Sequence, residues 1–199
     1  GEILLFENGT AEVVGSFDSG IVSMAWSPDY ELVIFATQNG TLIEMTKDWD
    51  IVTEVPIDKD QPSSEPNPEF HASLSWRGDG KVFACLASVA DQSAKLYVFD
   101  RACVHESSSE QGVKIEGKNL AWRPSGSVIT CTQQLPHRYD TIFFERNGLR
   151  HGEFTFREDC SVRQLEWNSS SDLLAVLVHK ESPDSNVRPT TVSSCFEFF

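Results

Sequence analysis

Cysteine, histidine and acidic side chains, the groups that most often carry catalysis or bind metals, are spread along this 199-residue chain without a catalytic spacing. The five cysteines form no C-x-x-C pair, and the five histidines show neither H-x-H nor H-x-x-x-H. They are Cys85, Cys103, Cys131, Cys160 and Cys195, and His71, His105, His137, His151 and His179. No G-x-S-x-G turn or phosphate-binding glycine loop occurs, and no carboxylate pair stands out among the 30 acidic residues. We therefore expect no catalytic, cofactor-binding or metal-binding residues, no cofactor and no enzyme activity.

Two kinds of short motif match recognition signals but fall where turns are expected. The tripeptide Arg77-Gly78-Asp79, which integrins read in other proteins, lies in the same position as Ser-Pro-Asp and Arg-Pro-Ser elsewhere in the chain. Three N-glycosylation sequons begin at Asn8, Asn39 and Asn168, and no secretion signal accompanies them. We interpret all of these residues as parts of turns.

The turns belong to a repeat that is marked by tryptophan. Trp26, Trp76, Trp122 and Trp167 follow one another at steps of 50, 46 and 45 residues. A turn rich in Pro, Asp, Ser or Gly follows each tryptophan, and an apolar run begins six residues after it. Repeats of about 40–50 residues that are built from strands and turns are typical of propeller blades. The indole ring is expected to pack between neighbouring sheets while its N–H finds a nearby carbonyl.

Two cysteines share one position of this repeat. Cys85 and Cys131 lie nine residues after their tryptophans, and Phe35 and Val176 occupy that position in the other two copies. A position that accepts Phe, Val or Cys is typical of a buried apolar site, where a thiol serves as a small hydrophobic group. We therefore expect core thiols rather than redox or metal-binding ones, and reduced thiols suit an intracellular protein.

The fold class predicted by the repeat is all-β, a partial WD40-like β-propeller with about four blades of a larger ring over residues 1–179. Asn-Gly pairs at 8–9, 39–40 and 147–148 mark hairpins between strands, because both residues accept positive φ. The expected order is a half blade, three full blades and a half blade, at 1–18, about 19–57, 70–105, 115–158 and 160–179. The two half blades are complementary and could close a four-bladed ring. We favour the cut ends of a larger ring, and hence a piece of a longer protein.

Three segments lack the blade pattern. Residues 58–68, with three prolines, and the serine-rich residues 102–112 are expected to be loops between blades. Residues 180–199 form an atypical tail, expected to be disordered or a divergent chain end.

The net charge of −14 limits the partners of this segment. Nucleic acid is held mainly by Lys and Arg, and the 16 basic residues are scattered. A basic protein partner fits the charge better. No run of about 18 apolar residues occurs, so no membrane-spanning segment is expected.

Several stretches between the tryptophans resemble the N-terminal propeller of the Elongator complex subunit 1 family, over about residues 2–178. They include Leu5–Thr10, Asp18–Ile21 and Met45–Asp48, the turns after Trp26, Trp76 and Trp122, and above all Phe143–Gly152. The resemblance implies a non-catalytic scaffold in the complex that modifies tRNA wobble uridine (U34). It implies as partners the catalytic radical-SAM and acetyltransferase subunit and a second propeller subunit.

The same resemblance implies where and how the parent protein works. Contact with tRNA is expected only through the whole complex, and no membrane partner is expected. The full-length parent is expected to be a homodimer through a helical region outside this chain, located in the cytoplasm and also the nucleus. The alternatives are a generic WD40 protein–protein interaction adaptor unrelated to Elongator and a small four-bladed hydrolase or lectin-like binder with a channel metal.

Overall fold

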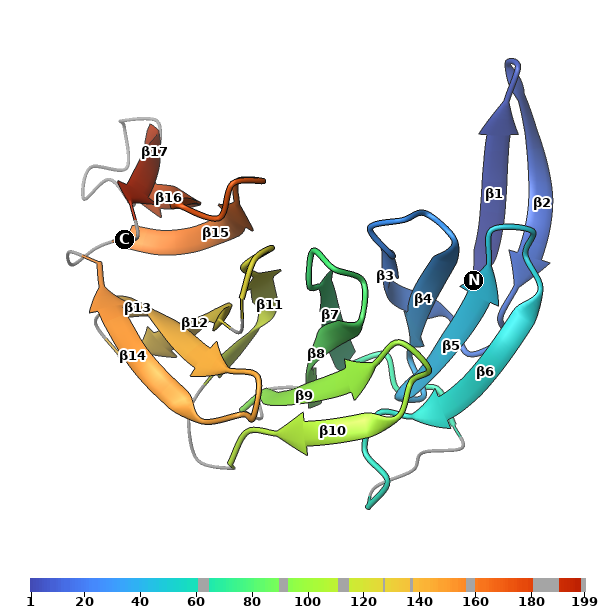
Figure 1. Ribbon diagram of the computed structural model, residues 1–199, viewed down its shortest axis with the longest axis horizontal. Helices are drawn as coiled ribbons and strands as arrows, with labels where there is room; N and C mark the ends of the chain where they lie inside the picture. Colours follow the sequence, from blue (N-terminus) through green and yellow to red (C-terminus); the bar gives the residue numbers. More distant parts are fainter. Residues whose placement is uncertain are drawn as a thin grey trace.

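The computed structural model describes residues 1–60, 65–89, 93–110, 115–126, 128–136, 138–156, 160–180 and 190–197. Within them the chain is all-β, and its strands form five antiparallel sheets that follow one another around an open arc (Figure 1). The predicted all-β, propeller-like architecture is therefore confirmed.

Each sheet uses strands that are consecutive in the chain. The first sheet pairs β1 (Glu2–Glu7) with β2 (Thr10–Ser16). Blade 1 contains β3 (Ile21–Trp26), β4 (Leu32–Thr37), β5 (Thr41–Thr46) and β6 (Ile51–Pro56). Blade 2 contains β7 (Phe70–Trp76), β8 (Val82–Val89), β9 (Lys95–Asp100) and β10 (His105–Ser108). Blade 3 contains β11 (Ile115–Trp122), β12 (Val128–Leu135), β13 (Arg138–Glu145) and β14 (Arg150–Thr155). The last sheet contains β15 (Cys160–Trp167), β16 (Leu173–Lys180) and β17 (Thr190–Glu197).

The first strand of each blade lies on the concave side of the arc (Figure 1). Strand β7 contacts both β3 and β11, and β11 also contacts β15, so these four strands form the inner wall. Each of the four ends with one of the repeated tryptophans. The sequence repeat therefore corresponds to one blade, with tryptophan at the end of the innermost strand.

The turn after each tryptophan has one shared backbone feature. The fourth residue after the tryptophan has positive φ in all four copies: Tyr30 at 60°, Gly80 at 65°, Gly126 at 112° and Ser171 at 67°. Glycine accepts this left-handed conformation without a Cβ clash, which explains its presence in two of the copies.

The Asn-Gly hairpins are present as predicted, but they are not all of one type. Asn8 and Gly9 both have positive φ, as a two-residue turn requires. In the turns that contain Gly40 and Gly148, the glycine has positive φ and the preceding asparagine does not. In both turns the glycine N–H donates to a carbonyl three residues earlier, from Gly40 to Thr37 and from Gly148 to Glu145.

The hydrophobic core lies in the seams between sheets. One cluster joins the first sheet to blade 1 through Ile3 and Phe35, and a second joins blade 1 to blade 2 through Leu42 and Phe83. Two further clusters join blades 2 and 3 and then blade 3 and the last sheet. Each sheet is thus stabilised mainly by its neighbour, as in other repeat architectures.

The region expected to be a loop at residues 102–112 contains the short outer strand β10, which pairs with β9. The expectation failed because an outer strand is partly solvated and lacks the apolar alternation that marks inner strands. The segment expected to be an atypical tail, 180–199, likewise contains β17, which pairs with β16 along its whole length. Thr190, Thr191 and Val192 are β-branched residues that favour a strand.

The described strands do not form the four-bladed ring considered above. The first sheet and the last sheet lie at opposite ends of the arc, and β2 and β17 belong to different sheets (Figure 1).

Candidate functional site

The repeated tryptophans lie in the seams between blades, as predicted. Trp76, Trp122 and Trp167 are buried. The indole N–H of Trp76 donates to the backbone carbonyl of Ala25 in blade 1 at 3.2 Å, and that of Trp167 donates to the hydroxyl of Thr130 in blade 3 at 3.0 Å. Trp122 instead donates to Gly126 in its own turn, at 3.3 Å. Two of the three indoles therefore bond across a seam.

Arginines that follow two of the tryptophans strengthen the same seams. The guanidinium of Arg77 lies 5.9 Å from the ring centroid of Trp122, and that of Arg123 lies 5.4 Å from the ring of Trp167. The Arg123 Nε also donates to the carbonyl of Ser171 at 2.7 Å. Sequence reasoning missed this stacking, although the Trp-Arg pairs at 76–77 and 122–123 were a usable signal. Each arginine stacks on the tryptophan of the next blade, and only the fold identifies that tryptophan as the partner.

The integrin-like tripeptide lies in a turn, as predicted, and the structure places this turn in the seam between blades 2 and 3. Arg77 donates two hydrogen bonds to the carboxylate of Asp79, at 2.9 and 2.8 Å, and this pairing lowers the pKa of Asp79. Gly78 donates its backbone N–H to the carbonyl of Pro124 in blade 3, at 3.1 Å. Both charged side chains are thus paired within the chain, and the glycine lies against the next blade.

The predicted burial of Cys85 and Cys131 is confirmed. Both are fully buried, and burial raises the pKa of each thiol. Cys103 is also buried, and burial raises the pKa of its thiol to about 12. Within the described residues all three are free thiols. Cys160 and Cys195 belong to strands β15 and β17, and their side chains lie outside the described part.

His105 in β10 and His151 in β14 lie in different blades. His105 packs edge-on against Tyr97 and Phe99, and His151 lies 3.2 Å from a carboxylate oxygen of Glu145. His137 lies outside the described residues. Among the residues that the structure describes, no group of three or more His, Cys, Asp or Glu side chains is placed to hold a metal ion. In the same part of the chain, no helix is long and apolar enough to cross a membrane.

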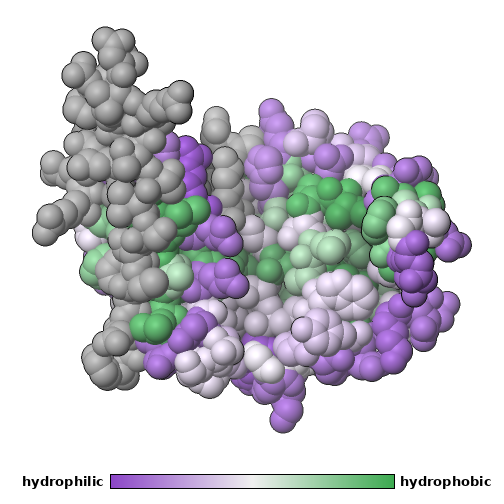
Figure 2. All heavy atoms as spheres, turned by 90° about the horizontal axis from the view of Figure 1, so that it is seen from above, coloured by the Kyte–Doolittle hydropathy of each residue, from purple (hydrophilic) through white to green (hydrophobic). Residues whose placement is uncertain are grey.

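Uncovered apolar side chains lie on the first sheet. Figure 2 looks onto the concave side of the arc and shows apolar surface at the end that β1 and β2 form. Leu4, Phe6 and Val13 are the exposed apolar residues there, with Phe6 75% exposed. They lie on one face, because Leu4 pairs with Val13 in the sheet and β-strand side chains alternate. The opposite face, with Ile3, packs on blade 1.

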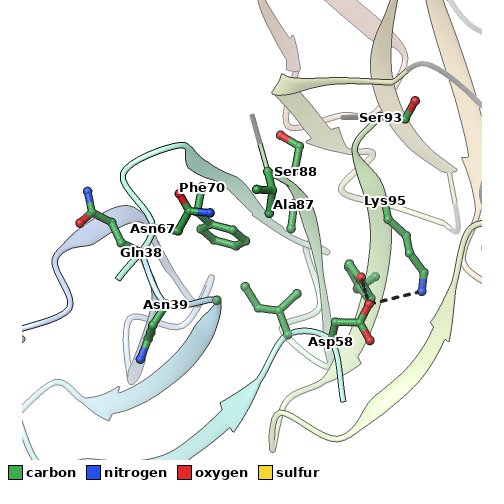
Figure 3. A pocket seen from close by; sticks show the side chains of 13 residues that line it. Gln38, Asn39, Asp58, Asn67, Phe70, Ala87, Ser88, Ser93 and Lys95 are labelled. Atoms are coloured by element: carbon green, nitrogen blue, oxygen red, sulfur yellow. Dashed lines mark hydrogen bonds and ion pairs between the residues drawn. The ribbon is translucent and has the colours of Figure 1, made fainter. Parts of the chain in front are cut away.

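A pocket lies in the seam between blades 1 and 2, at the end opposite the tryptophan turns (Figure 3). It has a volume of about 160 Å³. The β4–β5 turn, the segment after β6, the start of β7, the end of β8 and strand β9 all contribute to its lining. Ile57, Phe70 and Tyr97 form buried apolar parts of the wall, while Asn39 and Ser88 add polar groups.

A charged group within the pocket is already paired. The Tyr97 hydroxyl donates to the Asp58 carboxylate at 2.7 Å, and the Lys95 ammonium lies 3.7 Å from the same oxygen (Figure 3). Burial raises the pKa of Asp58, but the bonds from Tyr97 and from the Asp60 N–H, together with the Lys95 charge, outweigh it and lower the pKa. Burial, followed by the Asp58 bond, raises the pKa of the Tyr97 phenol. The Asp58 carboxylate is therefore ionised at neutral pH and is already bonded to Tyr97 and paired with Lys95.

Four-stranded antiparallel sheets around an arc, with a tryptophan at the end of each innermost strand, define a β-propeller of the WD40 type. A family model described as the ELP1 first N-terminal β-propeller matches residues 1–67 and 63–188. The chain therefore belongs to the family of Elongator complex protein 1, as the resemblance indicated.

Relatives and solved structures agree with this assignment. The Elongator complex protein 1 of Rattus norvegicus is 37% identical over 83% of this chain, and that of Drosophila melanogaster is 30% identical over 88%. The chain spans only 15% and 17% of the length of these two proteins. The solved structure of U3-55K matches with a TM-score of 0.63 at 13% identity. The match covers 92% of this chain and 54% of the U3-55K chain. The crystal structure of the RRP9 WD40 repeats matches with a TM-score of 0.61 at 13% identity, and the match covers 84% of this chain and 49% of the RRP9 chain. These two likenesses show the fold alone.

Proposed function

We propose that this chain is a scaffold segment of Elongator, without catalytic residues of its own, and that it helps to hold other subunits of that complex. The observation that carries the proposal is the match of the ELP1 propeller family over most of the chain. Its repeat positions also support a structural role: the arginines after the tryptophans stack across seams, and the two repeated thiols are buried.

The partners in this proposal are the catalytic radical-SAM and acetyltransferase subunit and a second propeller subunit. By holding them, the parent protein supports modification of wobble uridine (U34) in tRNA. Contact with tRNA is made by the whole complex, because a segment with a net charge of −14 repels phosphate. The parent protein is a homodimer and works in the cytoplasm and the nucleus.

Loss of the parent protein tests this role. Cells that lack it are expected to lose modified wobble uridines, measured by mass spectrometry of digested tRNA, and re-expression of the full-length protein is expected to restore them. Unchanged wobble-uridine modification after complete loss would refute the proposal and favour an adaptor unrelated to Elongator.

A further inference from the structure

The seam pocket between blades 1 and 2 has the size of one side chain. Its volume is about 160 Å³. Pockets for cofactors or drug-sized ligands are larger, roughly 300–1,000 Å³. A cavity of about 150 Å³ lined by apolar groups holds one benzene. The pocket therefore fits a single ring or a branched aliphatic side chain, and it is too small for a nucleotide or a dinucleotide cofactor.

The lining favours an apolar group with a polar attachment. Ile57 and Phe70 are buried apolar residues, and the ring of Tyr97 is covered by the Lys95 ammonium, 4.9 Å from its centroid. Asp58 is fixed by its bonds to Tyr97 and Asp60, so no bare carboxylate faces the cavity. Asn39 and Asn67 also line the pocket; their side-chain oxygens accept bonds from Thr37 and Glu69, and their amide N–H groups can donate to a peptide carbonyl. An apolar side chain on a peptide fits both parts.

The surroundings favour a basic segment. The described residues 58–60 and 65–69, which contribute Asp58 and Asn67 to the pocket, contain four acidic residues and one lysine. Asp60 and Glu69, which are exposed, lie within two residues of the lining residues Asp58, Asn67 and Phe70. The whole chain carries 30 acidic and 16 basic residues, which adds to the attraction for positive charge. Lysine or arginine next to the inserted side chain would lie beside these carboxylates.

We propose that this pocket is a docking site for another Elongator subunit, which inserts one leucine-sized or phenylalanine-sized side chain from an extended segment flanked by lysine or arginine. A small, partly desolvated pocket that receives one apolar anchor is the usual form of an interaction hot spot. The acidic rim orients the segment and the pocket fixes it. This inference rests on the proposed function, because it takes the partner from the same complex.

Photocrosslinking in the assembled complex tests the site directly. The probe is p-benzoylphenylalanine introduced in place of Ser93, an exposed residue of the pocket, in the full-length protein. The matched control places it at Ser169, an exposed residue of a turn at the other end of the blades. The expected result is a crosslink from position 93, absent from position 169, to a subunit peptide with an apolar residue between basic ones.

A blocking variant and a charge variant complete the test. Ser93→Trp is expected to fill the mouth and lower the affinity for the crosslinked subunit by about tenfold, the loss expected when a hot-spot pocket is blocked. Glu69→Lys is also expected to lower the affinity for the crosslinked subunit, and this loss should be larger at low ionic strength, where the charges are less screened. Ser169→Trp should change the affinity less than about twofold.

The outcomes separate the two proposals. If the other subunits co-purify but position 93 crosslinks to none of them, or to an acidic peptide, the docking inference is wrong and the scaffold proposal stands. If no other subunit co-purifies with the full-length protein, the scaffold proposal itself fails. An unchanged affinity in Ser93→Trp would also overturn the docking site.

Discussion

Gly78 is the most sensitive test of how the blades pack. A Cβ at this position would lie 2.7 Å from the backbone carbonyl oxygen of Pro124, below the 3.4 Å at which ordinary contact begins. The obstacle is backbone of the next blade, so no side-chain rotation relieves it. Gly78 has no positive φ, and alanine can therefore adopt its conformation without backbone strain. The whole cost of Gly78→Ala comes from the seam between blades 2 and 3.

The expected cost can be assembled from two parts. Overpacking at a tight contact costs about 1–3 kcal/mol. Opening the seam also weakens the bond from Gly78 N–H to Pro124, 3.1 Å in length, and a lost hydrogen bond costs about 0.5–1.5 kcal/mol. Gly78→Ala should therefore lower the free energy of unfolding by about 2–4 kcal/mol, and lower Tm by about 5–15 °C for a chain of this size.

Gly152 supplies the matched control. It lies in strand β14, with no atom within 4 Å of an added Cβ. Gly152→Ala should raise stability by about 0.5–1 kcal/mol, because alanine loses less backbone entropy on folding. Urea denaturation of the 199-residue chain and both variants measures the difference. If Gly78→Ala stays within about 0.5 kcal/mol of the parent chain, the tight contact between Gly78 and Pro124 is refuted.

Three further predictions concern the seams and the core. Trp167→Phe removes the hydrogen bond to Thr130 and should lower the free energy of unfolding by about 1 kcal/mol beyond the packing that it loses. Thr130→Val should lower the free energy of unfolding less in the Trp167→Phe background than in the parent chain. If urea denaturation shows that the two effects add, the bond is contradicted. Burial raises the pKa of Glu44 above 4.5, so the folded state binds its proton more tightly and stability falls as pH rises through this range. Glu44→Gln should therefore raise Tm at pH 8 and give no gain below about pH 4; equal gains at both pH values would refute this assignment. Cys85 and Cys131 should resist a thiol reagent in the native chain and react in urea, and rapid native labelling of either would contradict their burial.

The architecture could be predicted because its marker is local. Each tryptophan, its turn and the apolar run after it lie within about ten residues, so the period of the repeat can be read without knowing any contact. The shared position of Cys85 and Cys131 followed from the same register. Strand β10 was missed because an outer strand needs no apolar face, and serines there pair through their backbone.

The contacts between blades could not be predicted to the same degree. Arg77 stacks on a tryptophan 45 residues further along the chain, and only the order of blades brings the two together. The seam pocket combines Asn39, Phe70 and Tyr97 from three separate elements, and no motif connects them. A sequence pattern identifies strands and turns that repeat. A site between two blades depends on how the blades pack, and no single segment of the sequence shows that packing.

This segment is proposed to belong to a scaffold that holds other Elongator subunits. The most direct measurement is affinity purification of the full-length protein that contains it, under native conditions, followed by mass spectrometry. Near-stoichiometric recovery of the catalytic subunit and the second propeller subunit is expected. Recovery of folded full-length protein without either subunit would contradict it.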